Sequence, residues 1–366
     1  MVRPKKIQFT DALESILVSI WGGTKSNLDD SQIRKTRDAL VEIRAIYRFK
    51  GEYKNKYPSS INYQYPKNRA GYLAAFGQRH AYLPYFHLKR IEGINPKVIP
   101  HPERKKGELV VTTIGAGAAI EAYGICFFYN EEAHRLRKLR LNLIEKIDNW
   151  IPNRHTVYDK LLKGTFPKLE VIPHDITADL TKECIPIFSN HYDTIAKSDI
   201  LLIYNVMNEI LTKHSKMVWK NIKFILNNIE QPLLILLVEP SAPNASPRIN
   251  WIKTQLAECS NLINNMDEEE FLFDSEPLQI VYENTGVGLN DRLFGQNIDG
   301  SKPEFKTSIK RTHMACTIEP QSPVSMEQVN KQLSMLNIKR GKKGRFVRRQ
   351  RIEKTFWDLY PNWDKD

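Results

Sequence analysis

The stretch LVVTTIGAGAAIEAYG, from Leu109 to Gly124, decides the fold. An apolar run typical of a buried strand, Leu109–Ile114, ends at Gly115 and Gly117, and a helical pattern follows from about Ala118. Glycines let bare backbone and the N–H groups of a helix start come close to a ligand. We therefore expect a ligand at the carboxyl end of this strand, although a tight turn that binds nothing would have the same pattern.

Further short apolar segments alternate with helical or mixed sequence. This alternation predicts an α/β fold with a Rossmann-like, mostly parallel sheet covered on both faces. The candidate strands are Leu109–Ile114, Leu139–Glu145, Leu169–Pro173, Ile200–Tyr204 and Pro232–Glu239. Two later segments, Leu278–Glu283 and Ser308–Ile318, predict a closing antiparallel pair at the edge of the sheet.

Apolar residues at helical spacing precede the sheet. They predict two helices between Ile7 and Phe49, then a loop over Tyr53–Pro66 and a helical region over Arg69–Ile91. The aromatic face of that last region is expected in the core rather than as a platform for bases; it comprises Tyr72, Phe76, Tyr82 and Phe86. The predicted organisation is an N-terminal helical region (residues 1–94), a Rossmann-like domain (95–328) and a basic tail (329–366).

Composition excludes a fibrous or wholly disordered chain. The 366 residues are 41% hydrophobic and 26% charged, and the net charge is +12. Nine Lys or Arg residues and no acid lie between Lys331 and Arg351, which leaves +3 for the rest of the chain. We expect this tail to bind RNA, with a solvated tail or a nuclear-import signal as alternatives. The predicted RNA-binding residues are Lys339, Arg340, Lys342, Lys343, Arg345, Arg348, Arg349 and Arg351.

Cysteine spacing argues against a structural metal site. The four cysteines are more than fifty residues apart, so none forms a CxxC pair: Cys126, Cys184, Cys259 and Cys316. Charged residues interrupt the first segment, as they do not in a signal peptide, and the longest apolar run, Pro232–Val238, is too short to cross a bilayer. We expect a monomer without membrane contact in a reducing compartment, cytoplasmic or nuclear.

Acidic residues end the second and third candidate strands and indicate an adenosine group. Glu145, or Asp148 if the strand is longer, could accept both ribose hydroxyls, and Asp175 could accept the adenine amino group. Both acids could instead cap helices. The turn has Ile120 where a dinucleotide site has its third glycine, and it lacks the GKS or GKT of a nucleotide-triphosphate loop. S-adenosylmethionine, which has no phosphate, fits best. The predicted cofactor-binding residues are Gly115, Ala116, Gly117, Glu145, Asp175, Asn205 and Arg69.

The segment Leu109–Ile318 resembles the class I S-adenosylmethionine-dependent methyltransferases in its motif order. The upstream segment NRAGYLAAFGQRHAYLPY, Asn68–Tyr85, is similar to the fungal family that includes the 25S ribosomal RNA uridine-N3 methyltransferases. It is also similar to mitochondrial ribosome-assembly methyltransferase-like proteins, whose cysteine cluster is missing here. The resemblance implies methylation of large-subunit ribosomal RNA, free or in a pre-ribosomal particle. Ala119 stands where that family has a glycine, and its methyl group is expected to crowd the cofactor.

Methylation at N3 of uridine requires removal of a proton, which directs attention to polar residues at strand ends. Asn205 could position the ring, while Glu209 or Glu239 could accept the proton, although such residues often cap helices. The proline-containing loop Glu239–Pro247 is expected to face the substrate. Two alternatives remain open: a methyltransferase fold kept as a non-catalytic ribosome-assembly factor, and a methyltransferase of proteins or small molecules.

Overall fold

The computed structural model describes residues 9–23, 27–47, 58–131, 136–240, 246–272 and 308–320. The chain divides into two units, Met1–Pro320 and Gln321–Asp366, and every element described below belongs to the first. The boundary expected near residue 94 falls within this unit, and the boundary near residue 328 lies outside the described residues. The predicted three-part division therefore stays a prediction.

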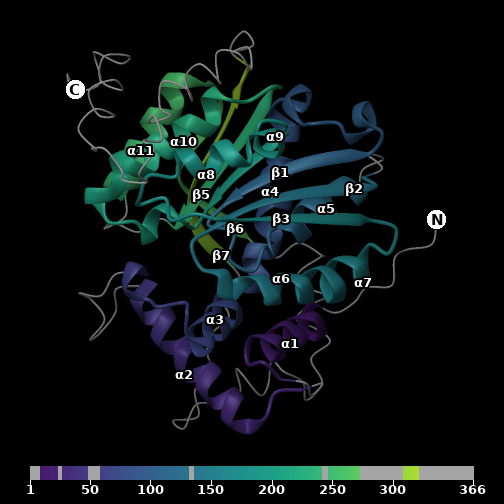
Figure 1. The fold of residues 1–366 in the computed structure, drawn as a ribbon, viewed down its shortest axis with the longest axis vertical. Helices are drawn as coiled ribbons and strands as arrows, with labels where there is room; N and C mark the ends of the chain where they lie inside the picture. The colour runs from purple at the N-terminus through teal and green to yellow at the C-terminus, as the bar shows by residue number, and fades with distance from the viewer. Residues whose placement is uncertain are drawn as a thin grey trace, which may run out of the picture. The chain divides into compact units, whose positions relative to one another are not determined.

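A seven-stranded sheet forms the centre of the first unit, with the strand order β3-β2-β1-β4-β5-β7-β6 (Figure 1). The first five strands are parallel, and β7 is antiparallel to both of its neighbours. The strands are β1 (Glu108–Ile114), β2 (Lys138–Glu145), β3 (Glu170–Thr177), β4 (Ile200–Tyr204), β5 (Leu233–Pro240), β6 (Asn261–Leu272) and β7 (Ser308–Ile318). The predicted α/β class is confirmed, and the five parallel strands lie where the apolar runs indicate them.

The strand β6 was not expected from the sequence. Its residues, NLINNMDEEEFL, are rich in Asn, Asp and Glu, which are depleted in strands. It forms at the edge of the sheet by pairing with β7, and two register shifts interrupt that pairing. β7 has the predicted bounds Ser308–Ile318, whereas the other predicted late strand, Leu278–Glu283, lies outside the described residues.

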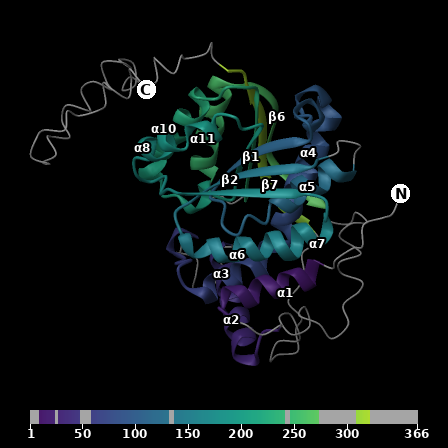
Figure 2. The ribbon, with the colours of Figure 1, turned by 45° about the vertical axis from the view of Figure 1, so that its right-hand side comes forward.

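Helices cover both faces of the sheet: α4 and α5 lie on one side, and α8, α10 and α11 lie on the other (Figure 2). The pair α4 and α5 packs closely because Gly124 has no side chain, since a Cβ there would be 2.5 Å from the carbonyl oxygen of Ala81. The helices that follow β1 are α5 (Ala122–Glu131), α6 (Ile151–Thr156), α7 (Lys163–Thr165), α8 (Ile185–Asn190), α9 (Tyr192–Ile195), α10 (Ser215–Asn227) and α11 (Ser246–Cys259).

The region before the sheet is helical, as predicted. It consists of α1 (Phe9–Ile20), α2 (Asp30–Tyr47), the short 3₁₀ turn η2 (Pro58–Ser60), α3 (Pro66–Tyr72), the π-helical segment η3 (Leu73–Gly77) and α4 (Gln78–Ile94). α1 contacts α6 and the π-helical segment η7 (Val157–Leu162), and η2 contacts the 3₁₀ turn η8 (Met207–Glu209) after β4. These contacts bring residues of α2 and of the loop before α3 to the carboxyl ends of the strands.

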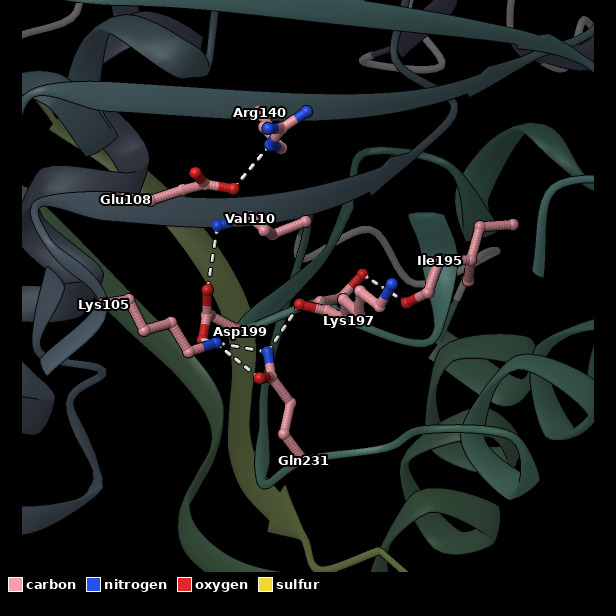
Figure 3. A network of polar contacts seen from close by, with 9 residues as sticks. Lys105, Glu108, Val110, Arg140, Ile195, Lys197, Asp199 and Gln231 are labelled. Atoms are coloured by element: carbon pink, nitrogen blue, oxygen red, sulfur yellow. Dashed lines mark hydrogen bonds and ion pairs between the residues drawn. The ribbon is translucent and has the colours of Figure 1, made fainter. Parts of the chain in front are cut away.

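A buried carboxylate fastens the amino ends of the central strands (Figure 3). Asp199, which directly precedes β4, accepts hydrogen bonds from the backbone N–H of Val110 (2.8 Å), from Lys105 Nζ (2.6 Å) and from Gln231 Nε2 (3.0 Å). These donors come from β1 and from the segments that lead into β1 and β5. Burial raises the pKa of Asp199, while the contact with Lys105 opposes that rise. The network ties three strands together at the edge away from the turn at Gly115.

None of the helices in the described segments is both long and apolar enough to cross a membrane. Within the same segments, no three His, Cys, Asp or Glu side chains gather as metal ligands. Three of the four cysteine side chains are buried in the sheet and its helices, and burial raises the pKa of the Cys316 thiol to about 12. These thiols are therefore protonated at neutral pH.

Candidate functional site

The turn after β1 has an unusual backbone. Gly115, Gly117 and Ala119 all have positive φ, at 66°, 47° and 57°. A residue with a left-handed backbone conformation cannot continue a right-handed helix. The helix α5 therefore begins at Ala122 and not near Ala118, where the sequence pattern predicts it. The turn is consequently longer than expected, and it exposes backbone over the carboxyl end of β1.

A cavity of about 230 Å³ lies over the carboxyl ends of β1, β2 and β4. We call it the strand-end cavity. Its walls combine the glycine turn, the ends of β2 and β4, the segment after β3, and aromatic side chains from the N-terminal helical region. The residues that line it and enter the argument are Tyr63, Tyr72, Leu73, Gly115, Ala116, Gly117, Ala118, Ile120, Glu121, Glu145, Lys146, Trp150, Asp179, Leu180, Thr181, Tyr204, Asn205, Val206, Glu209 and His214.

Glu145 lies at the end of β2 and lines the strand-end cavity, at the position where the sequence places a ribose-binding acid. Its Oε2 accepts the Gly117 N–H at 3.1 Å, and its Oε1 accepts the N–H groups of the next two residues at 2.9 and 3.1 Å. The alternative, Asp148, accepts a hydrogen bond from Thr177 and is not among the lining residues. The geometry thus favours Glu145 over Asp148, and its contact with ribose stays a prediction.

Glu209 lines the same cavity from the 3₁₀ turn after β4. Its Oε1 accepts hydrogen bonds from the phenol groups of Tyr47 in α2 and Tyr63 before α3. Burial raises the pKa of Glu209 to about 7, against the opposing effects of Tyr47 and Lys146. A carboxyl group with this pKa can exchange a proton near neutral pH, which is the property that a general base needs.

Comparisons with known proteins find only remote likenesses. No family model and no curated protein sequence matches this chain. A solved structure from Listeria monocytogenes, assigned to the class I S-adenosylmethionine-dependent methyltransferases, is 8% identical with a TM-score of 0.38, covering 89% of this chain and 98% of that one. A SAM-dependent methyltransferase from Methanosarcina mazei is 8% identical with a TM-score of 0.33, covering 61% and 99%. A 16S rRNA (adenine-N1) methyltransferase from Catenulisporales acidiphilia is 9% identical with a TM-score of 0.31, covering 60% and 92%.

The strand order, with β7 inserted antiparallel between β5 and β6, carries the assignment of the fold. The chain has a Rossmann-like α/β fold. In this fold the ligand lies where the strand order reverses, which here is the edge between β1 and β4. The strand-end cavity occupies that position.

Asp175 corrects one expectation. It does not end β3, which continues to Thr177, and it is absent from the lining of the strand-end cavity. Its carboxylate instead forms an ion pair with Arg154 of α6, whose Nε also donates to the carbonyl oxygen of Gly117 at 2.8 Å. The acid that does line the cavity after β3 is Asp179, two residues beyond the end of the strand.

Glu239, a predicted proton acceptor, has a structural contact instead. It is fully buried, and its Oε1 accepts the backbone N–H groups of Val206 and Met207 at 2.7 and 2.8 Å. Its Oε2 accepts the N–H of Asn208 at 3.3 Å. Glu239 therefore caps the turn that carries Glu209, and it is not among the lining residues. These contacts do not support the predicted role in proton removal, which stays a prediction.

Arg69, a predicted cofactor-binding residue, forms hydrogen bonds to the backbone of its own region of the chain. It is 5% exposed, and its Nη1 donates to the carbonyl oxygens of Tyr63 (2.9 Å) and Gln64 (2.8 Å). Its guanidinium lies 5.8 Å from the centre of the Trp150 ring. Arg69 thus holds the segment that carries Tyr63 and is not itself among the residues that line the strand-end cavity.

Asn205 follows β4 with a φ of 57°, a conformation that Asn adopts more readily than most residues. Its N–H donates to the carbonyl oxygen of Val238 at 2.8 Å, and the residue lines the cavity. Asn205 is therefore placed where it could touch the ligand. Its roles in binding the cofactor and positioning a base stay predictions.

The spacing of the sequence did not reveal several residues of the cavity. Tyr63 and Trp150 come from a loop and a 3₁₀ turn, and Tyr72, expected in the core, lines the cavity at the end of α3. Glu121, the last residue of the turn, also lines it, and its position directly after the glycine stretch was a signal that could have found it. By contrast, Ala119 is buried and is not a lining residue, so its methyl group does not project into the cavity.

Two predicted features lie outside the described residues. The basic residues of the tail, from Lys331 to Arg351, are among them. Residues 241–245 of the proline-containing loop after β5 are also outside, so its role in facing the substrate stays a prediction.

Proposed function

We propose that this protein binds S-adenosylmethionine in the strand-end cavity and transfers its methyl group to a nitrogen of RNA. The single observation that carries the proposal is one cavity that joins three features: the glycine turn after β1, Glu145 at the end of β2 and Glu209 after β4. In an α/β sheet of this order, these features support a nucleoside at one end of the cavity and a proton acceptor at the other.

The residues present fit this cofactor better than a phosphorylated one. Four acidic side chains, from Glu121, Glu145, Asp179 and Glu209, line the cavity with one lysine, Lys146, and this excess of acids disfavours a di- or triphosphate. The same groups suit a ligand with a sulfonium and an ammonium. Asp179 replaces Asp175 as the acid nearest the expected adenine end, because it follows β3 on the cavity side.

The acceptor that we propose is N3 of a uridine in large-subunit ribosomal RNA. The support is the similarity of Asn68–Tyr85 to the uridine-N3 methyltransferases, together with a carboxyl group of suitable pKa in Glu209. N3 lies on the pairing edge of uracil, so the target must be single-stranded or flipped out of a helix. The aromatic rings of Tyr63, Tyr72 and Trp150 could stack on such a base and exclude water.

The protein residues would act before and during transfer. When bound, S-adenosylmethionine supplies a methyl group activated by its sulfonium. Glu209 would take the proton from N3, while Tyr47 and Tyr63 hold its carboxyl group in place. Asn205 would position the ring so that N3 and the methyl carbon are in line. The new N–C bond forms as the S–C bond breaks, and S-adenosylhomocysteine leaves.

The basic tail, in this proposal, holds the RNA backbone through its Lys and Arg side chains, and the protein works on ribosomal RNA or a pre-ribosomal particle in the nucleus or cytoplasm. Phosphate contacts of this kind give affinity without base specificity. The choice of nucleotide would therefore come from the cavity and the residues around it.

Two measurements on the purified full chain test the proposal. Calorimetry should detect binding of S-adenosylmethionine, and a transfer assay with labelled cofactor and ribosomal RNA should yield 3-methyluridine by mass spectrometry. Glu209→Gln should bind the cofactor and lose transfer, whereas Glu183→Gln, at an exposed carboxylate outside the cavity, should keep both. Cofactor binding without any transfer to RNA would instead support the non-catalytic assembly factor.

A further inference from the structure

Glu121 is a nearly buried carboxylate that faces the strand-end cavity without a close counter-charge. Its side chain is 12% exposed, and it lines the cavity together with Leu73 and Ile120, which are apolar. Within the described segments, no side chain of another residue donates a hydrogen bond to it. Among the described residues, the one basic side chain recorded near it is His80, whose Nδ1 lies 4.0 Å from Glu121 Oε1. A buried carboxylate without a partner has an unfavourable free energy, so a cationic group of a ligand would stabilise Glu121 here.

The surroundings of Glu121 are held rigidly. His80 is 2% exposed, its Nδ1 lies 3.3 Å from the Tyr72 hydroxyl, and the Phe76 ring stacks on it with 8° between the ring planes. At 4.0 Å the imidazole is too far from Glu121 for a hydrogen bond. The carboxylate therefore keeps its acceptor capacity on the side that faces the cavity.

Its place along the turn indicates which part of a ligand it would meet. Glu145 contacts Gly117 from the β2 side of the turn, where the ribose is expected. Glu121 ends the turn and lines the cavity with Tyr204, the last residue of β4, on the opposite side of β1. The two acids thus approach the turn from its two sides, and a ligand that places its ribose at Glu145 extends past the turn toward Glu121.

We propose that Glu121 binds the α-ammonium group of S-adenosylmethionine and so fixes the amino-acid end of the cofactor in the strand-end cavity. This assignment rests on the proposed function. The contact is a charge-assisted hydrogen bond in a site shielded from water, where such bonds are strong.

A pair of probes isolates this contact by calorimetry with the full chain. S-adenosylhomocysteine carries the ammonium group, whereas 5′-methylthioadenosine lacks the whole amino-acid end but keeps adenine and ribose. Glu121→Gln should weaken binding of S-adenosylhomocysteine by about tenfold or more and leave 5′-methylthioadenosine within about twofold, as expected for loss of one charged hydrogen bond. The matched control Glu183→Gln, an exposed carboxylate outside the cavity, should change neither affinity.

Equal weakening of both probes, or no change in either, would overturn the assignment. Retained binding of 5′-methylthioadenosine also shows that the variant is folded. If the unmodified protein binds neither probe, the proposed function itself is wrong, so the two failures can be told apart.

A second measurement needs no variant. Burial raises the pKa of Glu121 to about 7, and the titratable groups beside it are His80 and Tyr204; Glu209, which lines the same cavity, also has a pKa of about 7. The ammonium of S-adenosylhomocysteine stays protonated between pH 6 and 8. Its affinity relative to 5′-methylthioadenosine should therefore rise over this range as Glu121 ionises, and a flat ratio would contradict the role of Glu121.

Discussion

At the scale of single residues, the two glycines of the turn both have a positive φ, but they differ in the room available for a side chain. Both have positive φ, yet a Cβ on Gly115 would overlap the Val206 side chain, whereas one on Gly117 would have its nearest neighbour, Trp150, 4.0 Å away. We expect Gly117→Ala to lower the free energy of unfolding by about 1 kcal/mol, the cost of a left-handed alanine. Gly115→Ala should cost about 1–3 kcal/mol more through overpacking. Urea unfolding of both variants measures the difference.

The double variant Gly115→Ala/Val206→Ala is the control for this interpretation. Removing the Val206 side chain relieves the overlap but not the backbone strain. The double variant should therefore lie closer to Gly117→Ala than the sum of the single changes indicates. Strict additivity would show that Val206 is not the obstacle.

The raised pKa of Glu209 makes a prediction about stability against pH. The folded-state pKa of about 7 lies above the ordinary glutamate value of 4.5, so the folded state holds this proton more tightly than the unfolded chain. The associated stability is complete below pH 4.5 and is lost as the pH rises through 7. The Gln side chain of Glu209→Gln does not titrate, so the variant has no such loss. Between pH 5 and 8 the free energy of unfolding of the variant, relative to that of the unmodified protein, should therefore increase by about 2–3 kcal/mol.

Urea unfolding at several pH values measures this difference. Glu121 titrates in the same range, but it is present in both proteins and its contribution cancels in the comparison. Parallel stability curves for the two proteins would contradict the buried, proton-holding state of Glu209.

At the scale of elements, α6 joins the edge strand β3 to the glycine turn through one side chain. Arg154 is 2% exposed and contacts both Asp175 and the carbonyl of Gly117. Arg154→Met should lower the free energy of unfolding by about 2–4 kcal/mol, because it leaves a partly buried carboxylate without its partner. The double variant Arg154→Met/Asp175→Asn should lose less than the sum of the single changes. Unfolding energies that simply add would show that the ion pair does not couple α6 to β3.

Some strands and helix ends could be predicted from neighbouring residues, whereas others depend on contacts with distant parts of the chain. The parallel strands β1, β2, β4 and β5 could be located from short apolar runs, because a buried strand needs such a run wherever it lies. β3, which is only partly buried, and β7, which begins with polar residues, were also located from the sequence. β6 could not be located from the sequence, because its polar residues form a strand only through pairing with β7 at the sheet edge. The start of α5 was missed for a related reason: no periodicity shows that Ala119 adopts a left-handed backbone.

At the scale of the whole molecule, charge is divided unequally along the chain. The residues between Lys331 and Arg351 contribute +9 of the net +12. Replacing Arg345, Arg348, Arg349 and Arg351 by Ala should weaken RNA binding and reduce the slope of log affinity against log salt by about 3, if each contacts a phosphate of a single strand. Affinity for S-adenosylhomocysteine, measured as a control, should not change. An unaltered salt slope would show that the tail does not hold the RNA.

The candidate site was predictable in part. Glu145, Asn205 and Glu209 lie at the cavity because acids and amides directly after strands must gather at one edge of a parallel sheet. Asp175 and Glu239 share this sequence cue, and Arg69 was predicted from the helix before the sheet, yet all three contact other parts of the protein and none lines the cavity. A position after a strand therefore indicates that a residue lies near the site, but it does not show whether the side chain faces the cavity or contacts another part of the protein.

The sequence by itself determined the parallel strands, the presence of the glycine turn and the edge at which a ligand would lie, because each of these shows in residues close together in the chain. The tertiary structure alone decided which acids are available there. Tyr47 meets Glu209 across 162 residues, and Arg154 meets Asp175 from another element. Such pairings depend on how helices pack against the strand ends, and the same packing buries Glu121 and Glu209 and raises the pKa of each to about 7.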